Sequence, residues 1–180
     1  MDTITTCIEV GEGLRLRRWR VSDLDALLRH ADDAEVSRGT SDRFPFPYTR
    51  ADGDAFLAGH VVDFSGPVLA VEVDGEACGG IGARALAGER RIGAELGYWL
   101  GRRHWGKGLM TRAVGAYLPW VMVELDVSRL QASVLDFNIA SARVLEKNGF
   151  VEEGVLRSAV LKRGLYHDLR VFGWLGEAPR

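Results

Sequence analysis

The sequence Arg103-His-Trp-Gly-Lys-Gly-Leu-Met-Thr-Arg112 places two glycines, Gly106 and Gly108, on either side of Lys107. It follows an apolar, strand-like run at residues 96–100 and leads directly into a helical pattern. A strand that turns through glycines into a helix presents unpaired backbone N–H groups at the positive end of the helix dipole. This arrangement predicts a binding site for a phosphate or pyrophosphate group.

The size and composition indicate an ordinary globular protein. The chain has 180 residues, 47% of them hydrophobic and 27% charged, and residues 1–180 are expected to form one domain. The formal net charge of −2 gives no bulk attraction to nucleic acid or to an anionic membrane. Cys7 and Cys78 lack the spacing of a disulfide framework, and the sequence shows neither a signal peptide nor an apolar run of about 20 residues. We therefore expect a cytoplasmic protein without nucleic-acid or membrane partners.

Hydrophobic periodicity and turn residues predict a mixed α/β fold. About seven strands are expected, at residues 14–19, 67–73, 78–84, 92–100, 130–135, 151–159 and 166–175. About four helices are expected, one capped by Ser22, one at 51–64, one from Gly108 and one at 138–148, with a loop at 37–50. Asp74-Gly75 is typical of a hairpin between the second and third strands. The resulting order, a central meander followed by helical crossovers, differs from the repeated βαβ units of a doubly wound nucleotide fold.

Two other interpretations of the glycine turn compete with a phosphate site of this kind. Glycines also suit a tight strand-to-helix turn that binds nothing. Residues 101–107 match the GxxxxGK pattern of a P-loop NTPase, but Gly108 replaces the Ser or Thr that coordinates Mg²⁺. The preceding meander, and the lack of a later apolar strand that reads as ending in a Walker-B aspartate, also argue against a nucleotide hydrolase.

A second segment, Asn138-Ile-Ala-Ser-Ala-Arg-Val-Leu-Glu-Lys-Asn-Gly-Phe150, follows about thirty residues later. Arg103-x-x-Gly106-x-Gly108 together with Asn138-x-x-Ser141 and Lys147-x-Gly149-Phe150 resembles the acetyl-coenzyme A signature of the GNAT superfamily of N-acetyltransferases. Segments 14–19, 95–100, 153–157 and 166–175 resemble the ribosomal-protein, RimJ/RimL-like branch, so that the resemblance covers nearly the whole chain. It implies a central, twisted, mixed and mostly antiparallel sheet whose fourth and fifth strands splay apart.

The resemblance also implies acetyl-CoA as the co-substrate. It places the pyrophosphate on backbone N–H groups of the 103–108 turn, and it pairs the backbone of the splayed strand with the pantetheine arm. The residues expected to bind acetyl-CoA are Trp99, Leu100, Gly101, Arg103, Gly106, Lys107, Gly108, Leu109, Met110, Asn138 and Ser141. Lys107 and Arg112 are alternatively solvated surface charges.

Asn138 and Ser141 could each either bind the co-substrate or stabilise the start of the helix that follows. The resemblance assigns the Asn138 side chain to the pantetheine, whereas asparagine is also a good helix N-cap. Many relatives place a thiolate-protonating tyrosine seven residues after this asparagine, but here that position is Leu145. We therefore expect Ser141, which RimL-like relatives use, to be the general acid or the donor to the sulfur. The alternative is a first-turn serine that bonds its own backbone.

The general base is expected to be Glu95, which alternates onto one face of its strand with Gly97 and Trp99. Its alternative role is a salt bridge with Arg84 or Arg91, and Asp136 and Glu72 are the fallback candidates for the base. An α-amine, with a pKa near 8, needs less help from a base than a lysine amine near 10.4. A weak base would therefore favour N-terminal acetylation.

The acceptor side is less defined by the sequence. Phe44, Phe46, Tyr48 and Trp99 either wall an acceptor pocket or pack internally, and Asp168 either orients the amine or holds a turn. Histidines 30, 60, 104 and 167 are scattered, so no metal site is expected.

We expect an N-acetyltransferase that moves acetyl directly to a primary amine, with the N-terminus of a protein such as a ribosomal protein as the acceptor. An antibiotic or polyamine acetyltransferase and a non-catalytic acyl-CoA-binding sensor are the alternatives, and a homodimer is left open.

Overall fold

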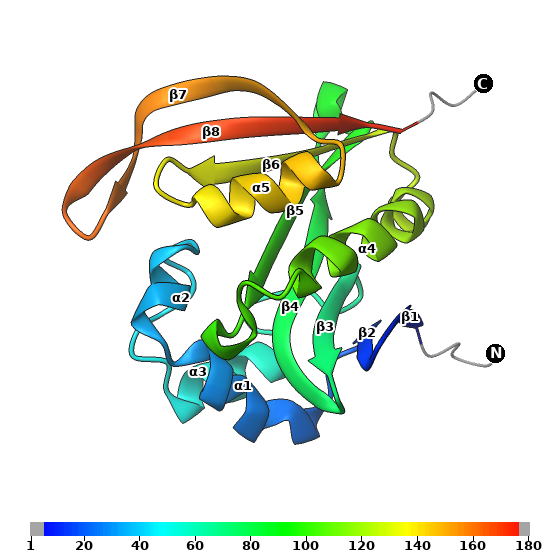
Figure 1. Ribbon diagram of the computed structural model, residues 1–180, viewed down its shortest axis with the longest axis vertical. Helices are drawn as coiled ribbons and strands as arrows, with labels where there is room; N and C mark the ends of the chain where they lie inside the picture. Colours follow the sequence, from blue (N-terminus) through cyan, green and yellow to red (C-terminus); the bar gives the residue numbers. More distant parts are fainter. Residues whose placement is uncertain (1–5, 177–180) are drawn as a thin grey trace.

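The computed structural model describes residues 6–176, which form one eight-stranded sheet flanked by helices (Figure 1). The strand order is β1-β2-β3-β4-β5-β6-β8-β7, and every neighbouring pair is antiparallel except the parallel pair β5–β6. The strands are β1 (Cys7–Gly11), β2 (Leu14–Arg17), β3 (Val68–Val73), β4 (Glu76–Ala85), β5 (Gly93–Leu100), β6 (Arg129–Leu135), β7 (Val151–Lys162) and β8 (Leu165–Leu175). The helices are α1 (Leu24–Ala31), α2 (Ala34–Arg38), α3 (Arg50–Leu57), α4 (Leu109–Leu125) and α5 (Ile139–Lys147). The predicted mixed, mostly antiparallel α/β fold is confirmed.

The predicted number of about seven strands was one too low, because β1 was missed. β1 is a sheet-edge strand whose residues are all partly or fully exposed, so it lacks the buried apolar face by which strands are recognised. Its signal in the sequence was the turn Glu12-Gly13, where both residues have positive φ angles of 51° and 75°.

The helices on the N-terminal side begin and end at other residues than predicted. Ser22 caps no helix, because it lies within a short 3-10 turn, Val21–Asp23, and α1 begins after it. Residues 37 and 38, predicted as loop, belong to α2, which Asp33 caps by accepting hydrogen bonds from the N–H groups of Glu35 and Val36. The helix predicted at 51–64 ends at Leu57, and Gly59 then takes a positive φ of 81°.

The central hairpin is as predicted. Asp74 and Gly75 join β3 to β4 with φ angles of 50° and 89°, the left-handed conformation that a two-residue hairpin turn requires. Beyond β5, α4 runs without interruption past Pro119. None of the helices in residues 6–176 is long and apolar enough to cross a membrane.

The helices cover the two faces of the sheet separately. Residues of α4 such as Ala113, Val114 and Tyr117 are fully buried against Leu96 and Leu100 of β5 in the main core. The intervening residue Trp99 packs instead into a second cluster built on α1 and residues 44–57. Because side chains alternate along a strand, these two clusters lie on opposite faces of β5.

The predicted splay of the fourth and fifth strands corresponds to β5 and β6. These strands pair only over Gly93, Ala94 and Glu95 with Arg129, Leu130 and Gln131, and then run apart (Figure 1). The remaining part of β5, residues 96–100, keeps its partner β4 on one side and has no strand on the other. The structure thus leaves an open backbone edge in the middle of the sheet.

Candidate functional site

The glycine turn lies where β5 leads into α4, and it fits an anion. Gly106 and Gly108 have φ angles of 72° and 71°, and apart from the adjacent residues no heavy atom of residues 6–176 lies within 4 Å of where a Cβ would stand at either position. Gly108 at the N-cap of α4 has no side chain, and none of the described residues supplies a capping hydrogen bond there. Arg103 and Lys107 are exposed and form no ion pair with any of residues 6–176. Open backbone, unused N–H groups and two uncommitted cations are what a pyrophosphate requires.

Arg112, four residues after Gly108, is committed elsewhere. Its guanidinium donates to the Glu12 carboxylate and to the Gly11 carbonyl, both at 2.7 Å. It therefore ties α4 to the β1–β2 turn, in keeping with the interpretation that it is not a phosphate ligand.

The open edge of β5 shows which of the predicted residues have backbone groups available to pair with the pantetheine arm. The Gly101 N–H donates to the Cys78 carbonyl at 2.7 Å, so the backbone of Gly101 faces β4, and by alternation that of Trp99 does too. Leu100 faces the opening, where its carbonyl accepts a 2.7 Å hydrogen bond from the Trp105 indole. Tyr98, which the sequence analysis did not single out, faces the same way.

Asn138 caps α5, which confirms its predicted local role. Its Oδ1 accepts a hydrogen bond from the Ser141 N–H at 3.2 Å. The side-chain amide nitrogen donates to no group among residues 6–176 and lies beside Gly39, at the end of α2. The cap uses the oxygen and leaves the amide hydrogens for a ligand, so the two predicted roles are compatible.

Ser141 forms a hydroxyl pair with Tyr98. The Tyr98 hydroxyl lies 2.9 Å from Ser141 Oγ and 3.1 Å from the Ser141 carbonyl. Burial raises the pKa of Tyr98 to about 12, although its hydrogen bond to Ser141 acts in the opposite direction. Leu145, at the usual tyrosine position, is completely buried in the core. Tyr98 is the functional candidate that the sequence analysis missed, because its alternation within the strand gave no sign that it reaches α5.

Glu95 lies at the point where β5 and β6 separate, on the face that carries Trp99. Its carboxylate accepts a 3.0 Å hydrogen bond from Arg84, which is the salt bridge foreseen as its alternative role. The side chain is 36% exposed, so this pair is solvated and weak.

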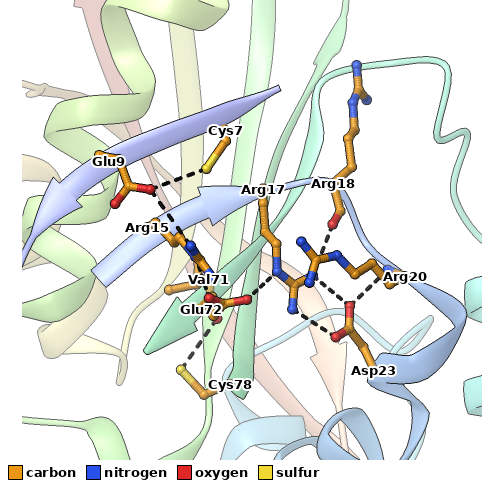
Figure 2. A network of polar contacts seen from close by, with 10 residues as sticks. All are labelled: Cys7, Glu9, Arg15, Arg17, Arg18, Arg20, Asp23, Val71, Glu72 and Cys78. Carbon is orange, nitrogen blue, oxygen red and sulfur yellow. Dashed lines mark hydrogen bonds and ion pairs between the residues drawn. The ribbon is translucent and has the colours of Figure 1, made fainter. Parts of the chain in front are cut away.

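The fallback candidate Glu72 was wrong. Its side chain is 1% exposed and lies between the guanidinium groups of Arg15 and Arg17, as Figure 2 shows, and Arg17 also binds Asp23 with two hydrogen bonds of 2.8 Å. Burial alone would raise its pKa, but the two arginines more than offset this and hold the pKa of Glu72 below its usual value. Glu72 is a structural anion, and no acceptor amine can reach it.

The second fallback candidate, Asp136, ends β6 beside the cap of α5. Its Oδ1 lies 3.0 Å from Nδ1 of His167, a residue of β8. Asp168, adjacent to that histidine, holds a turn: its Oδ1 accepts a 2.7 Å hydrogen bond from the Ser158 N–H at a bulge of β7. The groups of His, Cys, Asp or Glu among residues 6–176 include no cluster of three that could hold a metal ion.

The aromatic residues proposed for the acceptor pocket divide into two sets. Phe44 packs against Tyr48 and Trp99, with ring centroids 5.2 and 5.1 Å apart, and Tyr48 is buried. Phe46 is 49% exposed and lines a cavity of about 290 Å³ together with Phe44 and Lys162. Packing therefore accounts for Tyr48, whereas Phe46 remains open to a ligand.

Comparison with known proteins shows the family. Residues 13–151 match the model of the acetyltransferase (GNAT) domain. The chain belongs to the GNAT family of acetyltransferases. It is 30% identical to "Uncharacterized N-acetyltransferase p20" of Bacillus licheniformis over 97% of both chains. It is also 30% identical to the "Ribosomal-protein-serine acetyltransferase" of Escherichia coli (strain K12), over 44% of both chains.

The GNAT fold of the chain is seen in solved structures as well. The structure of "RimL- Ribosomal L7/L12 alpha-N-protein acetyltransferase in complex with Coenzyme A" superposes with a TM-score of 0.85 at 21% identity, over 97% of this chain and all of that one. The family match and the relative matched over nearly its full length confirm the N-acetyltransferase class of the chain, and the relatives named as ribosomal-protein acetyltransferases support the RimJ/RimL-like branch. GNAT acetyltransferases use acetyl-CoA, and the 103–108 turn fits its pyrophosphate.

Proposed function

We propose that this single acetyltransferase domain transfers acetyl from acetyl-CoA, by direct attack, to the N-terminal amine of a protein. The observation that carries the proposal is the open edge of β5, which has the uncapped start of α4 at one end and the Tyr98–Ser141 hydroxyl pair beside it. The choice of acceptor is supported by the relatives whose names specify ribosomal proteins.

In this proposal acetyl-CoA extends from the 103–108 turn, which binds its pyrophosphate, to the opening between β5 and β6, which binds its pantetheine arm. Backbone N–H groups of residues 106–110 and the side chains of Arg103 and Lys107 bind the pyrophosphate. The backbone at the open edge, contributed by Tyr98 and Leu100 more than by their neighbours Trp99 and Gly101, binds the pantetheine together with the amide of Asn138.

At the reacting atoms, Ser141 donates a proton toward the departing sulfur. Tyr98 fixes the rotamer of Ser141, since the two oxygens lie 2.9 Å apart, and a proton lost by the attacking nitrogen replaces the one that Ser141 gives. Glu95, on the opposite face of β5, is the sequence-based candidate for receiving the proton of the amine. The nitrogen attacks the thioester directly and no covalent enzyme intermediate forms.

The test is release of coenzyme A thiol with three acceptor sets: peptides with free Ser or Ala N-termini, polyamines, and aminoglycosides. We expect turnover on the peptides and a loss of about 100-fold or more in kcat for Ser141→Ala. The matched control, Ser65→Ala, changes an exposed loop serine and should retain full activity. Turnover confined to small amines would assign the acceptor to that class, and tight coenzyme binding without turnover on any acceptor would indicate a sensor.

A further inference from the structure

The pair Asp136–His167 lies at the mouth of the β5–β6 opening and has no part in the fold's core. Asp136 follows β6 directly, and Asn138, two residues on, caps α5 at Ser141. A turn closed by a 2.8 Å hydrogen bond from the Asn138 N–H to the Leu135 carbonyl separates them. The histidine pair is therefore next to the groups proposed to hold the thioester end of the donor.

His167 is on the opposite face of the sheet from Ser141. In β8, Phe172 lies in the main core, and Arg170 reaches Glu146 of α5. His167 is an odd number of residues from Phe172 in a strand whose pairing with β6 shows no bulge, so its side chain points to the other face. That is the face of Glu95 and Trp99, from which an acceptor would approach.

The carboxylate of Asp136 fixes the histidine ring. It accepts hydrogen bonds from the N–H groups of Phe137 at 2.8 Å and Asp168 at 3.1 Å, besides that from His167 Nδ1 at 3.0 Å. Partial burial would raise the pKa of Asp136, but these three donors outweigh it and keep the pKa below the usual value. An ionised Asp136 has no proton to give, so the Nδ1 of His167 carries the hydrogen and Nε2 carries the lone pair.

The ring is also supported from a second side and remains accessible. Phe137 packs edge-on against it with centroids 4.9 Å apart, and the guanidinium of Arg38 from α2 covers Phe137 at 4.4 Å. The His167 side chain is 18% exposed, and its Nε2 has no hydrogen-bond partner among residues 6–176. A histidine whose one nitrogen is held by a carboxylate while the other is open is the arrangement of a general base.

We propose that His167, oriented by Asp136, is the residue that takes the proton from the acceptor amine, a role that rests on the proposed acetyltransferase function. An acceptor that arrives as an ammonium ion gives one proton to Nε2 and attacks as the neutral amine. The C–N bond forms and the C–S bond breaks. The thiolate takes a proton from Ser141 and leaves as the thiol, and the second proton of the amine replaces the one that Ser141 gave. His167 returns its proton to solvent. Asp136 is a positioning residue, and Glu95 is left to its pair with Arg84.

Several charged groups surround the His167 ring. Asp136 faces it from the end of β6, Asp168 is its neighbour in β8, and Arg38 of α2 lies behind Phe137. Along β7, Arg157 lies in the bulge before Val160, the residue paired with His167, and Lys162, two residues beyond Val160, is bound to Asp42 at 2.9 Å.

The test compares His167→Asn, Asp136→Asn and Glu95→Gln over the pH range, with a peptide bearing a free Ser N-terminus as the probe. The amide of Asn at position 167 still reaches Asp136 but accepts no proton. We expect kcat/KM to fall by about 100-fold and the acidic limb of the pH profile to disappear, with the affinity for coenzyme A unchanged. Asp136→Asn should shift that limb, and the exposed-loop control Ser65→Ala should leave the profile as it is, whereas Glu95→Gln tests the competing candidate for the base.

A second measurement is independent of turnover. The ¹H–¹³C NMR signal of the His167 ring, assigned by its loss in His167→Asn, should shift when the peptide is added to protein saturated with coenzyme A. The role of His167 is overturned if this signal does not move, or if the acidic limb of the pH profile disappears in Glu95→Gln and not in His167→Asn. Either result leaves the acetyltransferase function intact. Failure of the wild type to acetylate any acceptor overturns both.

Discussion

Two polar groups in this molecule each hold a carboxylate ionised, but they differ in what they leave open. The N-terminal network joins Glu72 to Arg15, Arg17 and Asp23 between β2, β3 and the turn before α1, and Glu72 is 1% exposed (Figure 2). The pair Asp136–His167 lies at the mouth of the sheet opening, where His167 is 18% exposed. In both, hydrogen-bond donors hold a carboxylate ionised. The network leaves neither Glu72 oxygen open, whereas the pair leaves one imidazole nitrogen free, and this difference separates a structural site from one that can exchange protons.

The largest effect is expected when the closed network is broken. Glu72→Ala leaves Arg17 as a buried cation with one partner fewer, which should lower the free energy of unfolding by about 3–5 kcal/mol. Urea denaturation measures this loss. Glu153→Ala, which removes a more exposed partner of Arg129, is the control and should cost at most about 1 kcal/mol. Equal losses in the two variants would contradict the comparison.

The donor site should respond to the removal of an uncommitted cation. Arg103→Ala removes a charge that forms no ion pair in the described chain, and we expect a loss of about 1.5–3 kcal/mol in acetyl-CoA affinity. Isothermal titration calorimetry measures it. Arg112→Ala, a neighbouring arginine held by Glu12, is the matched control and should bind normally. If only the Arg112→Ala control bound acetyl-CoA more weakly, the phosphate site would have to be assigned to Arg112 instead of Arg103.

The charge of Glu72 makes stability depend on pH. Its folded-state pKa is lowered, so its stabilisation is complete above the unfolded pKa of roughly 4.3 and is lost as the pH falls through the lower folded value. Glu72→Gln keeps the size and removes the charge, so its deficit relative to the wild type should be smaller than that of Glu72→Ala. The deficit should also narrow below about pH 4. Thermal unfolding at several pH values follows it, and a constant deficit would show that the charge contributes nothing.

The smallest effect is expected at the hydroxyl pair. Tyr98→Phe removes one neutral hydrogen bond to Ser141. We expect the activation free energy to rise by about 0.5–1.5 kcal/mol and kcat to fall accordingly, with KM for acetyl-CoA unchanged. Steady-state kinetics give both constants, and Tyr166→Phe, an exposed tyrosine of β8, serves as the control. A loss as large as that of Ser141→Ala would make Tyr98 the proton donor in its own right.

The parts of the fold that local chemistry determines were predictable. The Asp74-Gly75 hairpin, the cap at Asn138 and the glycine turn each follow from the conformations that these residues favour. The strand β1 was missed because an edge strand carries little burial signal. The contacts of Tyr98, Glu72 and His167 depend on strands and helices that are far apart in sequence. The alternation of side chains along a strand predicts the face of the sheet on which each lies, but it does not identify the partner.

The central claim is direct acetylation of a protein N-terminal amine at the β5–β6 opening, and tandem mass spectrometry tests it. The protein is incubated with acetyl-CoA and two peptides that share a free lysine, one with a free Ser N-terminus and the other with that N-terminus blocked. We predict acetyl on the α-amine of the first peptide and none on either lysine. Acetylation of the lysine in both peptides, with the free N-terminus unmodified, would contradict the claim.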